Sequence, residues 1–179
     1  MKAIPTKLKQ CFIIEPSVFI DSRGYFFESF NQKTFNELIG QKVDFVQDNE
    51  SYSTKGVLRG LHFQKEEWAQ AKLVRVVKGC VLDVAVDIRK DSPTYGDYLS
   101  VELSDDNKKQ LFIPRGFAHG FVVLSDTAIF SYKCDNYYNK ASEGGIIYND
   151  TTLNIDWKLP FDKLIISEKD SILPTFETL

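Results

Sequence analysis

The segment that decides the fold is "KLVRVVKGCVLDVAVDI", residues 72–88. Its first half alternates apolar and charged side chains in the manner of a strand, and its second half is almost continuously apolar. Lys78 and Gly79 stand between the two halves and predict a tight hairpin turn. Because only Asp83 and Asp87 interrupt the apolar run, the second half is expected to be a largely buried strand.

Segments further along the chain repeat the strand pattern. They read "YLSVELS", "QLFIP", "GFVVLS" and "AIFSYKCD", and the turn "DT" predicts that the last two form another hairpin. Short strands separated by turns about every eight to twelve residues are typical of a β-sandwich or barrel. After Asp150 the periodicity weakens, so the C-terminal stretch is expected to wrap over the core.

One helix is expected, in the stretch "NQKTFNELIG". The residues that indicate it are Asn31 as N-cap, Gly40 as stop, and Phe35, Leu38 and Ile39 on one face. No repeat or low-complexity tract divides the chain, and 179 residues are enough for one domain with a real core. We therefore predict a single all-β domain over residues 1–179 with a few short helices.

The composition excludes several classes of function. A net charge of -3 gives no general attraction to nucleic acid or to an anionic membrane, so a bound anion needs local cations. The three cysteines, Cys11, Cys80 and Cys134, are odd in number and far apart, which argues against a disulfide framework. No segment has the apolar length of a signal peptide or of a membrane span of about 20 residues. We expect a cytoplasmic protein without nucleic-acid or membrane partners.

The chain has only two histidines, and each lies in a short motif. His119 ends "PRGFAH", which resembles the P-x-G-x-x-H element of the cupins, jelly rolls that close two sheets around a ligand-binding mouth. His62 lies in "VLRGLHFQ", where Gln64 occupies the place of the second imidazole of a metal-binding cupin. Glu66 and Glu67 lack the cupin spacing. We therefore expect no metal. A metal site of two histidines and one carboxylate, as in an oxygenase, is the alternative.

Nine segments together resemble one family, the dTDP-4-dehydrorhamnose 3,5-epimerases, which are the RmlC-like epimerases of deoxysugar synthesis. The segments are "DSRGYFFESF", "FVQDN", "GVLRGLHFQ", "QAKLVRVVKG", "DSPTYG", "KKQLFIPRGFAHGF", "YKCDNYY", "SEGGI" and "ISEKD". They occur in the family's order over nearly the whole chain. The stretch "KEEW" before Ala69 departs from the family, whose members usually carry prolines there, and this affects contacts at the rim of the site.

The resemblance implies a cupin-like jelly roll that acts as a homodimer without a cofactor. Such an enzyme inverts C3 and C5 of dTDP-4-dehydro-6-deoxy-D-glucose and gives dTDP-4-dehydro-L-rhamnose. The matching motifs imply that His62 is the base and Tyr132 the acid, with Lys72 near the keto oxygen. The residues that match substrate contacts are Arg23, Glu28, Gln47, Asp48, Asn49, Arg59, His119, Tyr138, Glu143 and Lys169. Of these, Tyr138 matches an aromatic side chain that stacks on thymine.

These residue types suit the removal and return of a proton beside a ketone. Imidazole, with a pKa of about 6.5, supplies a neutral base at pH 7, and a phenol, with a pKa of about 10, keeps its proton for the return step. An ammonium stabilises the enolate. The resemblance points to Asp170 as the carboxylate that orients His62, and Asp83 on a nearby strand is a rival candidate. Arg59 is expected to anchor phosphate.

Other interpretations of the same residues stay open at this point. Lys72 could be a solvated strand residue, and Tyr132 and Tyr138 could be core or interface aromatics. Arg23 could be an ordinary turn residue. For the whole protein, the alternatives are an epimerase that inverts a single carbon of a related nucleotide-linked sugar, and a non-catalytic cupin that binds a sugar nucleotide.

Overall fold

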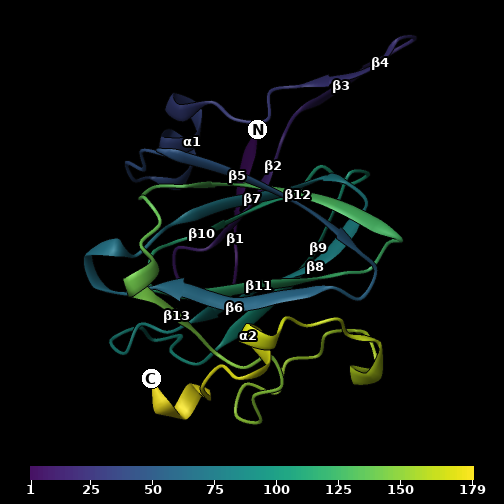
Figure 1. Cartoon of the computed structure of the whole chain (residues 1–179). Helices are drawn as coiled ribbons and strands as arrows, with labels where there is room; N and C mark the ends of the chain where they lie inside the picture. Colours follow the sequence, from purple (N-terminus) through teal and green to yellow (C-terminus); the bar gives the residue numbers. More distant parts are fainter.

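The structure is a computed structural model that describes residues 1–179. Two antiparallel sheets face each other across a shared core, as Figure 1 shows. The six-stranded sheet has the order β1 (Lys2–Pro5), β2 (Phe12–Glu15), β10 (Gln110–Ile113), β7 (Lys72–Lys78), β12 (Thr127–Cys134), β5 (Gln47–Thr54). The five-stranded sheet has the order β13 (Glu143–Gly145), β6 (Leu58–Gln64), β11 (Phe117–Val123), β8 (Cys80–Asp87), β9 (Tyr98–Ser104). The expected all-β, cupin-like jelly roll is thereby confirmed.

The position of strand β8 between two apolar clusters explains why its sequence is almost continuously apolar. Val81 and Ala85 face the core between the sheets, whereas Val84 and Val86 face a second apolar cluster on the other side of the five-stranded sheet. The C-terminal segment supplies that second cluster, with Trp157 among its fully buried side chains. A strand that is buried on both faces carries apolar side chains at successive positions and does not alternate apolar with polar residues. Both the buried strand and the wrapping C-terminal stretch are therefore confirmed.

The two expected hairpins are wrong. Strand β7 pairs with β10 and β12, whereas β8 pairs with β9 and β11, so the turn at Gly79 carries the chain from one sheet to the other. The same holds for β11 and β12 around Thr127. The two corners lie together: Gly79 has φ of 84°, a Cβ there would collide with the carbonyl of Thr127, and Ser125 Oγ accepts a hydrogen bond of 2.8 Å from Cys80 N. Turn chemistry thus predicts a reversal but not whether the two strands pair.

Helix α1 (Gln32–Ile39) forms as expected. Asn31 caps it by accepting a hydrogen bond of 3.1 Å from Thr34 N, and Gly40 ends it in the left-handed conformation. Phe35 and Ile39 pack on the outer face of the six-stranded sheet. Leu38 was expected on the same face, but it is exposed. In an eight-residue helix that lies on a sheet, the buried stripe is narrow.

The remaining helical elements are short. They are α2 (Glu168–Ser171) and single 3₁₀ turns at Glu66–Trp68, Lys140–Ser142, Phe161–Lys163 and Phe176–Thr178. No helix of the structure combines the length and the apolar character that crossing a membrane requires.

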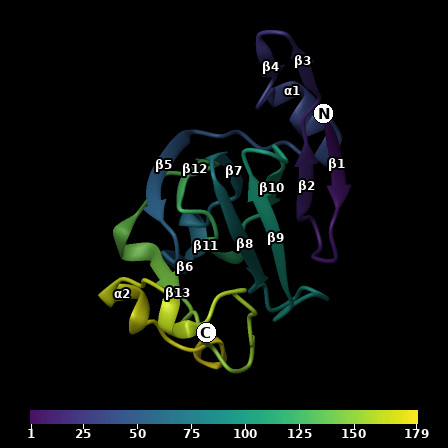
Figure 2. The same cartoon turned by 90° about the vertical axis from the view of Figure 1, so that its right-hand side faces the viewer.

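A two-stranded arm projects from the body of the molecule, and Figure 2 shows it from a second side. It consists of β3 (Val18–Asp21) and β4 (Gly24–Phe27), which pair only with each other. At its tip, Asp21 Oδ1 accepts a hydrogen bond of 2.8 Å from Arg23 N. Its large apolar side chains, including Phe19, Ile20, Tyr25 and Phe26, are exposed.

Candidate active site

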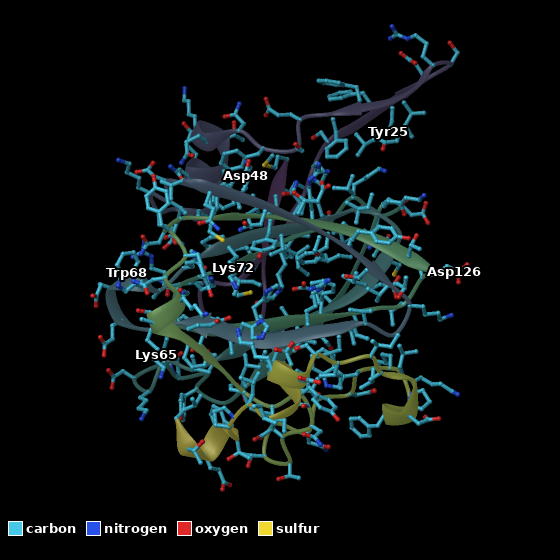
Figure 3. The ribbon with its side chains drawn as sticks, in the orientation of Figure 1. Tyr25, Asp48, Lys65, Trp68, Lys72 and Asp126 are labelled. Atoms are coloured by element: carbon cyan, nitrogen blue, oxygen red, sulfur yellow. The ribbon has the colours of Figure 1, made fainter.

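A cavity of about 540 Å³ lies between the two sheets. The polar residues on its wall are Glu50, Ser51, Arg59, His62, Lys72, His119, Tyr132, Ser167, Lys169 and Asp170. A second hollow, of about 270 Å³, continues from it to Gln47, Asn49, Gln64, Gln70, Tyr138 and Glu143. The two hollows share His62, Lys72 and Tyr132. These three side chains therefore stand in the middle of one elongated site, and Figure 3 shows Lys72 between the sheets.

A β-bulge in β6 turns Arg59 and His62 into the same cavity. On the neighbouring strand, His119 pairs with His62 but Phe121 pairs with Arg59, so β6 holds one extra residue there. In a regular strand, residues three apart point to opposite faces. Gly60 makes the bulge possible: its φ is 125°, and a Cβ would lie 2.6 Å from the backbone of the facing strand. The glycine in "LRGLHF" therefore determines where the first histidine points.

A buried carboxylate orients His62. Its Nε2 lies 2.8 Å from Oδ1 of Asp170, and Oδ2 of Asp170 accepts a hydrogen bond of 3.2 Å from Gly60 N. Burial alone would raise the pKa of Asp170, but the hydrogen bonds from His62 and Gly60 outweigh it and hold this pKa below its usual range. An ionised carboxylate only accepts, so Nε2 carries the hydrogen and Nδ1 is the basic nitrogen.

The rival assignment of Asp83 to His62 is wrong. Asp83 Oδ2 lies 2.9 Å from Nε2 of the other histidine, His119. Each histidine thus has its own carboxylate, and Asp170 belongs to His62. Asp170 lies in the C-terminal segment, in helix α2. Ser167 caps this helix by accepting a hydrogen bond of 3.1 Å from Asp170 N, and this places the aspartate under β6.

Tyr132 and Lys72 line the cavity from the opposite sheet. Burial raises the pKa of Tyr132, so its hydroxyl keeps its proton at neutral pH. Lys72 Nζ makes no hydrogen bond or ion pair and lies 5.9 Å from the centre of the Tyr132 ring. Burial lowers the pKa of this lysine, while the nearby charges of Asp83 and Glu143 act in the other direction. The amine of Lys72 thus has no partner in the protein and is free to meet a ligand.

A network of hydrogen-bonded side chains lies at the far end of the site. Lys169 Nζ lies 2.6 Å from Oε1 of Glu143, and the hydroxyl of Tyr138 donates to Oε2 of the same carboxylate at 3.2 Å. The backbone N–H of Tyr138 donates to Gln47 Oε1 at 3.1 Å, and Gln47 Nε2 donates to Asn49 Oδ1, also at 3.1 Å. Tyr138 is 53% exposed, so its side chain is accessible to a stacking partner.

Three residues that sequence motifs imply as substrate contacts lie away from the cavity of their own chain. Arg23 is at the tip of the arm, where it pairs with Asp21, and Glu28 follows the arm and accepts a hydrogen bond from Asn31. Asp48 lies on the outer face of β5 and pairs with Lys133 at 3.0 Å (Figure 3). Side chains alternate between the two faces of β5, so Asp48 points away from the cavity that Gln47 and Asn49 line.

The structure also brings in residues that the sequence motifs did not indicate. Ser51 lines the cavity, and Ser53 accepts a hydrogen bond of 3.1 Å from Arg59 Nε. Both follow Asn49 with the two-residue period of β5, so that period was the available signal. Ile165 and Ile166, which cover one side of the cavity, had no such signal, because the C-terminal segment carries no regular pattern.

The structure gathers no group of three or more histidine, cysteine, aspartate or glutamate side chains that could hold a metal ion. Each histidine instead bonds a single carboxylate. The site brings together an imidazole oriented by a carboxylate on one wall and, on the other, a protonated phenol and an amine without a partner in the protein. A jelly roll with this set of groups defines a cupin-type enzyme of acid–base chemistry.

Comparison with known proteins gives the family. Residues 5–178 match the profile of the family described as dTDP-4-dehydrorhamnose 3,5-epimerase. The chain belongs to this family.

Relatives of known structure and known name support the assignment over the whole chain. The enzyme of that name from Shigella flexneri is 58% identical over 170 residues, 95% of this chain and 93% of the relative. The crystal structure from Elizabethkingia anophelis is 59% identical with a TM-score of 0.96, and covers 99% of this chain and 97% of that one. A Legionella pneumophila epimerase in complex with dTDP-4-keto-L-rhamnose is 49% identical with a TM-score of 0.95, over 99% and 94% of the two chains.

Proposed function

We propose that the protein epimerises C3 and C5 of dTDP-4-dehydro-6-deoxy-D-glucose and gives dTDP-4-dehydro-L-rhamnose. The observation that carries the proposal is the placement of His62, oriented by Asp170, across the cavity from Tyr132. The two carbons flank one keto group, so a single base, acid and cation can serve both. The names of the close relatives, and the ligand of the Legionella enzyme, support this substrate.

The proposed chemistry assigns one step to each group. His62 Nδ1 removes the proton from the carbon beside the ketone, and the electron pair moves onto the keto oxygen to form an enolate. The ammonium of Lys72 stabilises that oxygen at a scale of several kcal/mol, since it has no other partner in the protein. Tyr132 returns a proton to the carbon from the opposite wall. Solvent then restores the starting protonation of both side chains.

The elongated shape of the site suggests how the substrate lies. The diphosphate, which joins the sugar to the thymidine, passes between the two hollows, and the sugar lies against His62, Lys72 and Tyr132 on the side of the larger hollow. Arg59 and His119, which line only the larger hollow, contact anionic oxygens of the substrate. Thymine stacks on Tyr138 in the smaller hollow, where the other polar side chains include Gln47, Asn49 and Glu143, with Lys169 bonded to Glu143.

Incubation of dTDP-4-dehydro-6-deoxy-D-glucose with the protein in deuterated water, followed by NMR, tests the proposed function. We expect deuterium at both C3 and C5, together with the inverted product. Incorporation at one carbon would replace the proposal with a single-carbon epimerase. No incorporation would leave a protein that binds sugar nucleotides without turnover.

Arg59→Ala and Lys72→Ala are expected to act on different kinetic constants. A charge-assisted contact to diphosphate contributes about 1.5 to 3 kcal/mol in the ground state, so Arg59→Ala should raise KM by about 10- to 100-fold. The enolate charge develops only in the transition state, so Lys72→Ala should lower kcat. Steady-state kinetics of both variants separate the two roles. If both variants changed KM alone, Lys72 would not serve the keto oxygen.

We also propose that the protein works as a homodimer in which each arm reaches the cavity of the other copy. The arm, which projects from the body in Figure 1, packs on no core of its own chain. It exposes Ile20 at 82% and Phe26 at 70%, so a second protein surface is needed to cover it. It also carries Arg23, and Glu28 follows it. Both residues then join the site in the dimer, although they lie away from the cavity of their own chain.

Complementation between two defective variants tests this arrangement. One chain carries Arg23→Ala with Glu28→Ala, and the other carries His62→Ala. In a mixed dimer, one site combines both defects and the other has none, so refolding equal amounts together should restore about a quarter of wild-type activity. Each variant refolded alone is the control. If the arm acted within its own chain, mixing would restore nothing.

Activity is expected to survive exhaustive chelation, because the proposed steps use only side chains. The assay is turnover after dialysis against EDTA, with metal content measured in the same sample. Loss of turnover that one specific divalent ion restores would replace the cofactor-free scheme with the metal-dependent alternative.

The remaining proposals concern the protein as a whole. We take residues 1–179 as one domain, because the arm, both sheets and the C-terminal segment all contribute to the proposed site. We place the protein in the cytoplasm, where its three free cysteines, two of them buried, stay reduced. Its partners are the nucleotide sugar and a second copy of itself, and its charge of -3 gives no reason to add nucleic acid or membrane.

A further inference from the structure

A second carboxylate–imidazole pair lies at the floor of the cavity, and the steps proposed above assign no role to its carboxylate. It joins Asp83 on β8 to His119 on β11, with 2.9 Å between Oδ2 and Nε2. The two residues are diagonal neighbours, since Asp83 pairs with Phe121 and His119 pairs with Ala85. Asp83 is 0% exposed and His119 is 8% exposed, so bulk water does not screen the pair.

The geometry leaves one polar atom of His119 for a ligand. Its Nε2 is taken by Asp83, and its ring stacks on Phe130 with 6.1 Å between centres and 23° between planes. The ring lines the cavity, and Nδ1 makes no hydrogen bond within the protein. Because turning the ring would break the bond to Asp83, Nδ1 is the ring nitrogen that is left for a ligand.

The charge of the pair follows from its surroundings. Asp83 Oδ1 is buried without any partner, and a buried carboxylate is stable only where positive charge lies near it. If His119 were neutral and gave its Nε2–H to Asp83, Nδ1 would turn a lone pair towards an anionic substrate, which is repulsive. A protonated ring avoids this, since both of its nitrogens donate.

The other charged and titratable groups that line the cavity form no hydrogen bond or ion pair with Asp83 or His119. They are Glu50, Arg59, His62, Lys72, Tyr132, Lys169 and Asp170. His62 instead bonds Asp170, and Lys169 bonds Glu143. Two groups interact with Asp83 through charge alone: Lys72, whose charged form Asp83 favours, and the buried thiol of Cys11, whose ionisation Asp83 opposes.

We propose that Asp83 is a positioning residue that keeps His119 protonated and so presents an Nδ1–H to a negatively charged oxygen of the bound sugar nucleotide. The inference rests on the proposed function, which supplies the anionic substrate. Asp83 does not touch the substrate and acts through His119. The site then holds two carboxylate–imidazole pairs with opposite tasks: Asp170 prepares a base, and Asp83 prepares a donor.

The state of the ring can be measured directly, because the chain contains only two histidines. Nitrogen NMR of the ¹⁵N-labelled protein resolves both imidazoles, and His62→Ala assigns them. With dTDP bound at neutral pH, we expect His119 to carry a proton on both ring nitrogens, and Asp83→Asn to lose the one on Nδ1. A neutral His119 in the wild-type protein with dTDP bound would overturn the proposal, and this result needs no variant other than the assignment.

Kinetics test whether the donor matters. Asp83→Asn keeps the size and an oxygen that accepts Nε2–H but removes the charge, so kcat/KM at neutral pH should fall about 10- to 100-fold. The loss should shrink as the pH is lowered, since solvent then protonates His119. His119→Gln should show a similar loss without this recovery.

The double variant separates positioning from mere structure. Because Asp83 acts through His119, Asp83→Asn should add little to the loss already caused by His119→Gln. Losses that multiply in the double variant would reject the proposal. A rise in KM would assign the anionic oxygen to the diphosphate, and a fall in kcat would assign it to the enolate; both results support a donor at His119. The NMR measurement and the affinity for dTDP require no turnover, so they decide the inference even if the wild-type protein inverts no carbon.

Discussion

His62→Ala is expected to give no epimer and to leave the substrate free of solvent deuterium. Without the imidazole, nothing in the cavity removes the proton at C3 or C5, so no enolate forms. Loss of a positioned base lowers rates by about 10²- to 10⁴-fold. Neither remaining group replaces it, because Asp170 is buried under β6 and His119 is bonded to Asp83. Proton NMR of the substrate in deuterated water measures exchange and inversion in one sample.

Two variants serve as controls for this result. Asp170→Asn keeps the imidazole but removes the charged acceptor of its Nε2–H, so exchange should slow without vanishing. His119→Ala removes the other imidazole of the chain and should retain measurable exchange. Exchange at the wild-type rate in a folded His62→Ala protein would mean that another group is the base.

Tyr132→Phe is expected to separate exchange from inversion. The change removes one hydroxyl and leaves the packing of the ring, so His62 can still form the enolate. His62 can then only return a proton to the face from which it took one. Substrate should therefore gain deuterium at C3 and C5 while the yield of epimer falls by about 10²-fold or more.

Tyr138→Phe is the matched control, because its hydroxyl bonds Glu143 at the nucleoside end and faces no reacting carbon in our proposal. It should invert both carbons at a rate close to that of the wild-type protein. Normal inversion by Tyr132→Phe would show that this tyrosine is not the acid. Joint loss of exchange and inversion, with folding and binding intact, would reject a scheme of one base and one acid.

The elements of the fold could be predicted from the sequence, but their pairing could not. Alternation and apolar runs place β7, β8 and β12, and the caps Asn31 and Gly40 place α1. These signals are local. Whether the two strands on either side of Gly79 pair with each other depends on the other strands available to each. Strands β7 and β8 pair with partners in different sheets. Local turn signals carry no information about that choice.

The residues of the site could be predicted from sequence motifs, but the contacts between them could not. His62, Lys72 and Tyr132 do meet, as the motifs imply. Which carboxylate serves which histidine depends on the bulge at Gly60 and on the course of the C-terminal segment, both of which involve contacts between distant parts of the chain. The alternation of β5, which points Asp48 outwards, was visible in the sequence, but it gives a direction only once the strand's inner face is known.

The assembly of this site from distant segments has a consequence for how the protein matures. The contact between His62 and Asp170 spans 108 residues, and Lys72 and Tyr132 stand on the facing sheet. Asp170 is synthesised after every strand of both sheets, since the last strand, β13, ends at Gly145. A nascent chain on the ribosome can therefore build most of both sheets before its base is oriented. Recovery of catalysis after refolding thus requires the docking of the C-terminal residues under β6 in addition to the formation of the barrel.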